Sequence, residues 1–246
     1  MKIPLCKPSI DNDEIKLVAK SLKSSWLTHG PFNHKFESLF NKKFKIKYSI
    51  AMNSCTSALE CSVKSLGVTG EIIIPSFTWV STANAVINCG SIPVFADVNF
   101  NTRNIDVNSI KKCITKKTIA IIVVHFAGLP CDMSKISKFC KKKNIKIIED
   151  SAESLGSKYK HKKKINDIFF SCYSFNGNKL ITSGGGGLIS MNNIKDYNLA
   201  THLSSQAKKD AIQFIHDDVG FNFRMSNLHA AIGMSQISNL KKIKKK

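Results

Sequence analysis

A lysine followed closely by a run of glycines has the clearest chemical potential in this sequence. Lys179 lies in the segment SFNGNKLITSGGGG, residues 174–187, between an apolar run and four glycines. Such glycines let the backbone approach a bulky group closely or turn tightly. A lysine in a partly desolvated pocket gives up its proton more readily and can form a Schiff base with a carbonyl compound. A glycine-rich turn with an incidental surface lysine is the competing interpretation, and this segment alone does not decide between them.

An acid at the end of an apolar run is the second feature. Asp150 lies in the segment IKIIEDSAESLG, residues 145–156, directly after Glu149. A buried carboxylate is costly unless it has a cationic partner. A protonated pyridine nitrogen would be such a partner, and the pairing would keep a cofactor ring an effective electron sink. The alternative is a helix N-cap formed by Asp150 or Ser151, and for this segment alone the cap is the simpler explanation.

Hydroxyl side chains follow another apolar run, in the segment MNSCTSALE, residues 52–60. Backbone N–H groups and hydroxyls at the start of a helix form an anion site, so a phosphate could lie against Thr56 and Ser57. Helix capping is the alternative, and it needs only one of these hydroxyls.

Trp79 lies in the segment IPSFTWVSTANAV, residues 74–86, just after a predicted strand. In that position an indole could stack on a planar ring. A tryptophan that fills the hydrophobic core is the usual alternative.

The elements that must position these residues alternate in type. Short apolar runs rich in β-branched residues predict strands at 48–52, 71–75, 92–96, 119–124, 145–149, 169–174 and 188–191. Segments of helical period predict helices at 12–22, 33–41, 56–65, 80–88, 133–143 and 227–243. This alternation predicts an α/β protein with a mostly parallel sheet flanked by helices. Because ligands of such sheets gather at the carboxyl ends of the strands, the four segments above are expected to meet there.

Composition narrows the classes of function. The 246 residues carry a net charge of +20, but arginine occurs only at Arg103 and Arg224, and no aromatic residues interleave with a basic stripe. Because specific readers of nucleic acid rely on arginine, we expect a solvated lysine-rich surface and no specific nucleic-acid partner. No apolar run is long enough to span a membrane and no signal peptide is evident, so a cytoplasmic protein is expected. The eight cysteines form no CxxC pair or metal-like cluster, which predicts reduced core thiols and no metal site.

The order of the four segments resembles the fold type I transferases that use pyridoxal 5'-phosphate (PLP), whose fold is aspartate aminotransferase-like. More narrowly, the chain resembles the DegT/DnrJ/StrS family of sugar aminotransferases over essentially its whole length. The segments that carry this resemblance are IPLCKPSI, SSWLTHGPFNHKFE, NSCTSAL, PSFTWVSTANAV, PVFADV, VVHFAGLPCDM, IIEDSAESLG, FSCYSFNGNKLITSGGGG and DVGFNFRMSNLHAAIGMSQI. Within the family, Glu153 and the segment YSFNGNK are most similar to perosamine synthetases, which aminate GDP-4-keto-6-deoxymannose.

The resemblance implies a role for each residue of the site. Lys179 would be the catalytic lysine that binds PLP, Asp150 the partner of the pyridinium nitrogen, and Trp79 the aromatic residue that stacks on the ring. The implied phosphate ligands are Thr56, Ser57 and Ser174. Glu153 would lie beside the cofactor, where many relatives have glutamine or histidine. Asn222 matches the segment with which a neighbouring subunit reaches the cofactor phosphate, so a homodimer with a composite active site is implied.

The implied reaction moves an amino group from an amino acid, by analogy glutamate, to a nucleotide-linked keto sugar destined for a surface polysaccharide such as O-antigen. A PLP-dependent sugar dehydratase is one alternative, but that branch of the family replaces the lysine with histidine. A non-catalytic PLP-binding relative is another, because residues 1–246 match the large domain and the smaller C-terminal domain of the family is expected to be absent. Two exchanges depart from the family pattern: Gly185 replaces the usual glutamate of GEGG, and Cys55 stands where many relatives have glycine.

Overall fold

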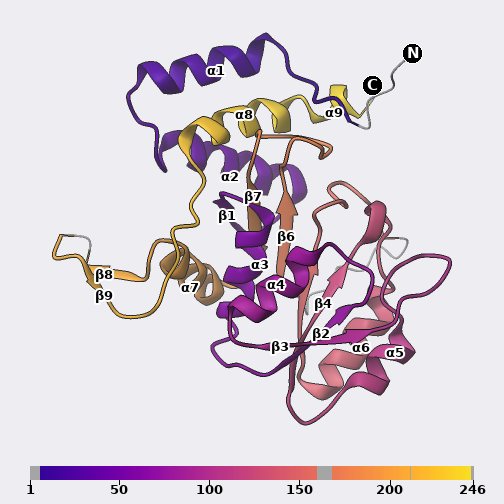
Figure 1. Cartoon of the computed structure of the whole chain (residues 1–246). Helices are drawn as coiled ribbons and strands as arrows, with labels where there is room; N and C mark the ends of the chain where they lie inside the picture. The colour runs from indigo at the N-terminus through magenta and orange to yellow at the C-terminus, as the bar shows by residue number, and fades with distance from the viewer. Residues whose placement is uncertain (1–5, 160–167, 211, 245–246) are drawn as a thin grey trace.

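A seven-stranded sheet forms the centre of the computed structural model, which describes residues 6–159, 168–210 and 212–244. The strands are β1 (Tyr48–Met52), β2 (Glu71–Pro75), β3 (Ile92–Ala96), β4 (Thr118–Val124), β5 (Lys146–Asp150), β6 (Ile168–Ser174) and β7 (Gly187–Met191). Their order across the sheet is β1-β7-β6-β5-β4-β2-β3, and only β7 runs antiparallel to its neighbours. The sheet is therefore mostly parallel, which confirms the predicted fold class. A separate ribbon of β8 (Lys208–Asp210) and β9 (Ile215–His216) projects from the body (Figure 1).

Helices cover both faces of the sheet (Figure 1). Their bounds are α1 (Asn12–Lys23), α2 (Pro31–Phe44), α3 (Cys55–Lys64), α4 (Val80–Asn88), α5 (Val107–Cys113), α6 (Met133–Lys143), α7 (Ile194–Ser204), α8 (Asn227–Ser238) and α9 (Leu240–Ile243), with a 3-10 turn η1 (Phe126–Gly128). Helices α3, α4 and α7 enclose one hydrophobic core against the sheet. On the opposite face, α5 and α6 enclose a second core, while α2 and α8 enclose a third. The sheet is thus buried on both sides.

Local chemistry explains where several helices begin. Asp11 accepts a hydrogen bond from the amide of Asp13, and Glu14 reaches back to the amide of Asp11, so α1 starts with a capping box. Ser54 caps α3 by accepting from the amide of Ser57. None of the helices in the described ranges is both long and apolar enough to cross a bilayer.

Most predicted elements occur within two or three residues of their expected bounds, and two deviations affect the argument. The predicted helix at 227–243 is wrong in its length: it ends at Ser238, and a separate turn starts at Leu240. Asn239 separates the two, in agreement with the preference of asparagine for helix ends. The fifth strand runs one residue further than predicted, so Asp150 is its last residue. Of the cysteines expected in the core, Cys6 is exposed.

Candidate active site

Lys179 lies in the turn between β6 and β7, at the carboxyl end of β6. Its amide donates to the carbonyl oxygen of Asn176 at 3.0 Å, which closes the turn. Its side chain is 19% exposed, and its Nζ lies 3.5 Å from Oε1 of Glu153. Together with Ser174 and Asn178, these two residues line a cavity of about 240 Å³. The lysine is therefore held in a pocket beside a carboxylate, which favours the functional interpretation of the glycine-rich segment over an incidental surface lysine.

Asp150 is a buried carboxylate at the carboxyl end of β5, with only 5% of its surface exposed. Its Oδ2 accepts a hydrogen bond from Oγ1 of Thr82 on α4, and its Oδ1 accepts from the amide of Ala152, both at 3.1 Å. Within the described residues it forms no ion pair. Burial raises the pKa of the Asp150 carboxyl, and the two hydrogen bonds together with the charge of Lys179 oppose that rise.

The hydroxyls at the start of α3 have different roles. Ser54 is the cap, and its Oγ also lies 2.9 Å from Oγ of Ser57. Thr56 is not needed for capping, and its side chain makes no hydrogen bond to the rest of the described chain. Close by, β7 begins at Gly187, where a Cβ atom would collide with the backbone of Ser54 and Cys55. The absence of a side chain at Gly187 thus lets β7 pass directly over the amides that open α3.

Trp79 lies just before α4, and 79% of its surface is exposed. This exposure excludes the interpretation of Trp79 as a core residue. An indole left uncovered at the carboxyl end of a parallel sheet offers a flat apolar surface to a ring-shaped ligand.

Glu153 is oriented by the backbone of a loop that follows β4. Its Oε2 accepts a hydrogen bond from the amide of Ala127 at 2.8 Å, and Ala127 has a left-handed backbone with φ of 49°. Ser174 ends β6 and is buried, and its Oγ accepts a long hydrogen bond of 3.4 Å from the amide of Asn176. Both predicted site residues therefore line the same cavity as Lys179.

Asn222 lies apart from that cavity on an exposed segment between β9 and α8. Its carbonyl oxygen accepts a hydrogen bond of 3.3 Å from Nδ2 of Asn53, the residue that precedes Ser54. The single chain leaves the Asn222 side chain exposed, so its expected role across a subunit interface stays a prediction.

Three contributors to the site were not identified from the sequence: Thr82, Ala127 and Asn178. Thr82 meets Asp150 only because α4 packs against the sheet, and the contact spans 68 residues of sequence. Asn178 adjoins Lys179 and could have been found by proximity alone. Ala127 acts through its backbone amide, which carries no sequence signal.

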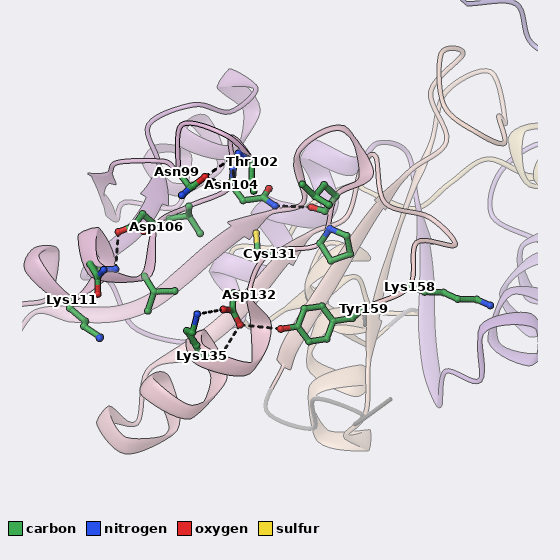
Figure 2. A pocket seen from close by; sticks show the side chains of 15 residues that line it. Asn99, Thr102, Asn104, Asp106, Lys111, Cys131, Asp132, Lys135, Lys158 and Tyr159 are labelled. Atoms are coloured by element: carbon green, nitrogen blue, oxygen red, sulfur yellow. Dashed lines mark hydrogen bonds and ion pairs between the residues drawn. The ribbon is translucent and has the colours of Figure 1, made fainter. Parts of the chain in front are cut away.

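A larger cavity of about 700 Å³ lies elsewhere, between the segments after β3 and β4 (Figure 2). None of the predicted site residues lines it. Asp132 pairs there with Nζ of Lys135 at 2.7 Å and accepts from the hydroxyl of Tyr159 at 3.0 Å. Asn104 donates to the carbonyl oxygen of Leu129 at 2.9 Å. These polar groups are paired with one another, so size alone does not make this cavity the reaction site.

Comparison with known proteins agrees with this geometry. Residues 8–246 match the family model described as the DegT/DnrJ/EryC1/StrS aminotransferase family. The chain is 37% identical over 238 residues to the GDP-perosamine synthase of Escherichia coli O157:H7, covering 96% of this chain and 65% of that protein. It thus spans slightly less than two thirds of that relative's length.

Solved structures have the same fold. The Helicobacter pylori aminotransferase involved in the biosynthesis of pseudoaminic acid superposes with a TM-score of 0.91 and 30% identity, over 98% of this chain and 67% of that one. The E. coli GDP-4-keto-6-deoxy-D-mannose-3-dehydratase with bound hydrated PLP gives a TM-score of 0.90 and 25% identity, over 98% of this chain and 68% of that one.

Proposed function

The chain belongs to the DegT/DnrJ/EryC1/StrS aminotransferase family, and on that basis we propose that it is the PLP-binding large domain of a sugar aminotransferase. The observation that carries this proposal is a buried carboxylate that forms no ion pair within the described residues, together with a lysine held in a pocket. Asp150 ends β5, and Lys179 lies in the turn after the neighbouring parallel strand β6, which ends at Ser174. A cofactor with a basic ring nitrogen at one end and an aldehyde carbon at the other matches this pair of groups.

The surroundings of Asp150 fit PLP. Within the described residues Asp150 forms no ion pair, so the pyridinium of PLP would supply the direct cationic partner that a carboxylate buried to this degree requires. The exposed indole of Trp79 would cover one face of the ring. The phosphate would lie against Thr56 and Ser57 at the start of α3, with Ser174 at the end of β6 as a further ligand. Each of these positions lies at a strand end or shortly after one, as expected for a ligand of a parallel sheet.

Each residue of the proposed site would have a separate role in the reaction. PLP, when bound, supplies the electron sink that allows an amino group to leave one carbon and join another. Asp150 would hold its carboxylate against the protonated ring nitrogen, and Trp79 would hold the plane of the ring. Lys179 would hold the cofactor through Nζ and, once released from it, would take a proton from the substrate carbon or return one to it as a general base and acid. Glu153, fixed by the amide of Ala127, keeps a carboxylate beside that amine.

The substrates form the finer part of the proposal. The name of the E. coli relative supports a nucleotide-linked keto sugar such as GDP-4-keto-6-deoxymannose as amino acceptor, and we propose glutamate as donor. We further propose a homodimer in which Asn222 reaches the partner's cofactor phosphate, a cytoplasmic location, and a product used in surface polysaccharide such as O-antigen.

Covalent trapping tests the cofactor assignment. Purified protein is incubated with PLP, reduced with borohydride and digested, and the peptide that carries the added mass is identified. We expect the label on Lys179 and a visible absorbance band that borohydride removes. The matched control is Lys179→Ala, in which neither should occur. Labelling spread over surface lysines, with no preference for Lys179, would refute the site.

Turnover is tested separately, by adding glutamate to the PLP-loaded protein and quantifying pyridoxamine phosphate after denaturation. An aminotransferase produces pyridoxamine phosphate together with 2-oxoglutarate. A protein that only binds the cofactor produces neither, and that outcome would refute the proposed activity while leaving cofactor binding intact. Subsequent addition of GDP-4-keto-6-deoxymannose should yield an amino sugar, whereas a deoxygenated sugar without nitrogen would identify a dehydratase.

A further inference from the structure

A buried His–Glu pair lies behind the proposed site, on the opposite side of β5. Because successive strand residues point to opposite faces, Glu149 points away from the face that Asp150 occupies. Nε2 of His125 lies 3.4 Å from Oε1 of Glu149, and the two residues are 6% and 9% exposed. Oγ of Ser171 donates to the other carboxylate oxygen at 2.6 Å. The pair has no part in the cofactor contacts proposed above.

His125 is fixed from several directions. The amide of Cys131 donates to Nδ1 at 3.2 Å, so Nδ1 is the acceptor nitrogen and Nε2 carries the proton toward Glu149. The backbone amide of His125 donates to the carbonyl oxygen of Asp150 at 3.2 Å. The side chain therefore connects the first residue of the loop 125–131 to its last residue and to β5. This places the pair at the base of the loop.

The same loop holds Glu153. The amide of Ala127 donates to Oε2 of Glu153 at 2.8 Å, and Oε1 of Glu153 lies 3.5 Å from Nζ of Lys179. Ala127 has a left-handed backbone, which alanine adopts only when its surroundings enforce it. Asn104 also tethers the loop, because its Oδ1 accepts from the amide of Phe126 at 3.0 Å and its Nδ2 donates to the carbonyl oxygen of Leu129 at 2.9 Å. The His–Glu pair adds a separate attachment at the two ends of the loop, His125 and Cys131.

We propose that the buried His125–Glu149 pair positions Lys179: it fixes the loop 125–131 so that the Ala127 amide holds the Glu153 carboxylate beside Nζ. The inference rests on the proposed function, in which Lys179 is the reacting amine. His125 and Glu149 are positioning residues, because neither touches the lysine. A purely structural role for the pair would affect the stability of the fold but not the environment of Nζ.

The reactivity of Lys179 in the cofactor-free protein tests this. Reductive methylation with formaldehyde and cyanoborohydride at a fixed pH is followed by mass spectrometry of the Lys179 peptide, with the exposed Lys195 as internal reference. Loss of the neighbouring carboxylate in Glu153→Gln should speed modification about two- to fivefold, because Nζ then loses the charged partner that lies 3.5 Å away and is freer to reach the reagent. His125→Phe should give the same increase.

The double variant and two controls make the result specific. His125→Phe combined with Glu153→Gln should be no faster than either alone, because both changes remove one interaction. Glu149→Gln retains an acceptor for Nε2 of His125, so Lys179 should be modified at the wild-type rate. Glu149→Leu removes that acceptor, so Lys179 should be modified as fast as in His125→Phe. Ile110 lies in the core enclosed by α5 and α6. Ile110→Ala should lower the melting temperature without changing the modification rate of Lys179.

A wild-type rate in His125→Phe, or additive effects in the double variant, would overturn the proposal. If His125→Phe does not fold, His125→Asn makes the same test, because its Oδ1 can still accept from Cys131 while the side chain falls short of Glu149. Since the assay contains no PLP, the outcome is separate from cofactor binding: absence of PLP labelling in the wild type would refute the proposed function, not this measurement.

Discussion

Replacement of Asp150 with asparagine should change stability differently with and without PLP. The carboxylate is 5% exposed and has no ion pair in the described chain, and burial raises its pKa. Asparagine has nearly the same size and can keep both hydrogen bonds. Its Oδ1 would accept from the amide of Ala152, and its Nδ2 would donate to Oγ1 of Thr82, whose own hydroxyl can then donate to Oγ1 of Thr78.

Without cofactor, the substitution removes a buried charge while leaving its hydrogen bonds satisfied. A neutral buried group that lacks a partner already costs about 1–3 kcal/mol, and an ion costs more. The two hydrogen bonds that Asp150 accepts offset part of that penalty. We therefore expect Asp150→Asn to increase the free energy of unfolding of the cofactor-free protein by about 1–2 kcal/mol at pH 8.

With cofactor, the same substitution removes a charge-assisted hydrogen bond to the pyridinium. Such a bond is worth about 2 kcal/mol, so the PLP dissociation constant should rise about 30-fold. At a PLP concentration of about 100 times the wild-type dissociation constant, binding stabilises the wild type by about 2.7 kcal/mol and the variant by only about 0.9 kcal/mol. The advantage of the variant should thus disappear when PLP is present.

The assay is urea unfolding followed by circular dichroism, at pH 8, with and without PLP. The matched control is Asp132→Asn, since Asp132 is also a helix-proximal aspartate but is paired with Lys135. It should gain no stability without cofactor and should respond to PLP as the wild type does. The reasoning is refuted if Asp150→Asn destabilises the cofactor-free protein, or if PLP stabilises wild type and variant equally.

Three further changes test separate parts of the structure. Gly187→Ala places a Cβ against the backbone of Ser54, so urea unfolding should show a loss of about 1–3 kcal/mol, while Gly185→Ala, with open space around it, should be nearly neutral. Trp79→Ala should leave the melting temperature of the cofactor-free protein unchanged, because the indole is exposed. It should weaken PLP binding about three- to tenfold in a fluorescence titration, and an unchanged affinity would argue against ring stacking. Burial raises the pKa of the Glu37 carboxyl from 4.5 to about 7, against the opposing hydrogen bond from the amide of Ala51. The unfolded chain therefore loses its proton first, and the free energy of unfolding should fall by up to about 3 kcal/mol as pH rises from 4.5 to 7. Glu37→Gln should lack that part of the pH dependence, and identical profiles for both proteins would contradict the assignment.

Much of the architecture could be predicted because it is encoded locally. Runs of β-branched residues predicted β1, β2 and β3 at their observed bounds, and helical periodicity did the same for α4 and α6. Two helices were missed. Helix α5 has only seven residues, and α7 has a weakly segregated apolar face, so neither presents the periodic pattern on which such predictions depend. The strands β8 and β9 were also missed, because at three and two residues they are too short to show an alternating pattern.

The candidate site was predictable in its single residues and not in its contacts. Asp150 stands at a strand end and Lys179 in the turn after one, places that sequence patterns locate, and their order along the chain matched a family. The exposure of Trp79 could not be read from its neighbours, because burial depends on which elements pack over a residue. The position of Glu153 was visible as well, but the amide that orients it was not.

The sequence by itself determined the order of the seven strands of the large sheet and of most helices, and the residue types that lie at the carboxyl edge of that sheet. Tertiary structure alone decided which of them meet. Thr82 reaches Asp150 across 68 residues, and Ala127 reaches Glu153 across 26. Local propensity and periodicity carry no information about such pairs, because packing of distant elements, rather than neighbouring residues, brings their atoms within hydrogen-bond distance. The sequence therefore places Lys179 after β6, but only the folded structure places its Nζ beside Glu153 in a shared cavity.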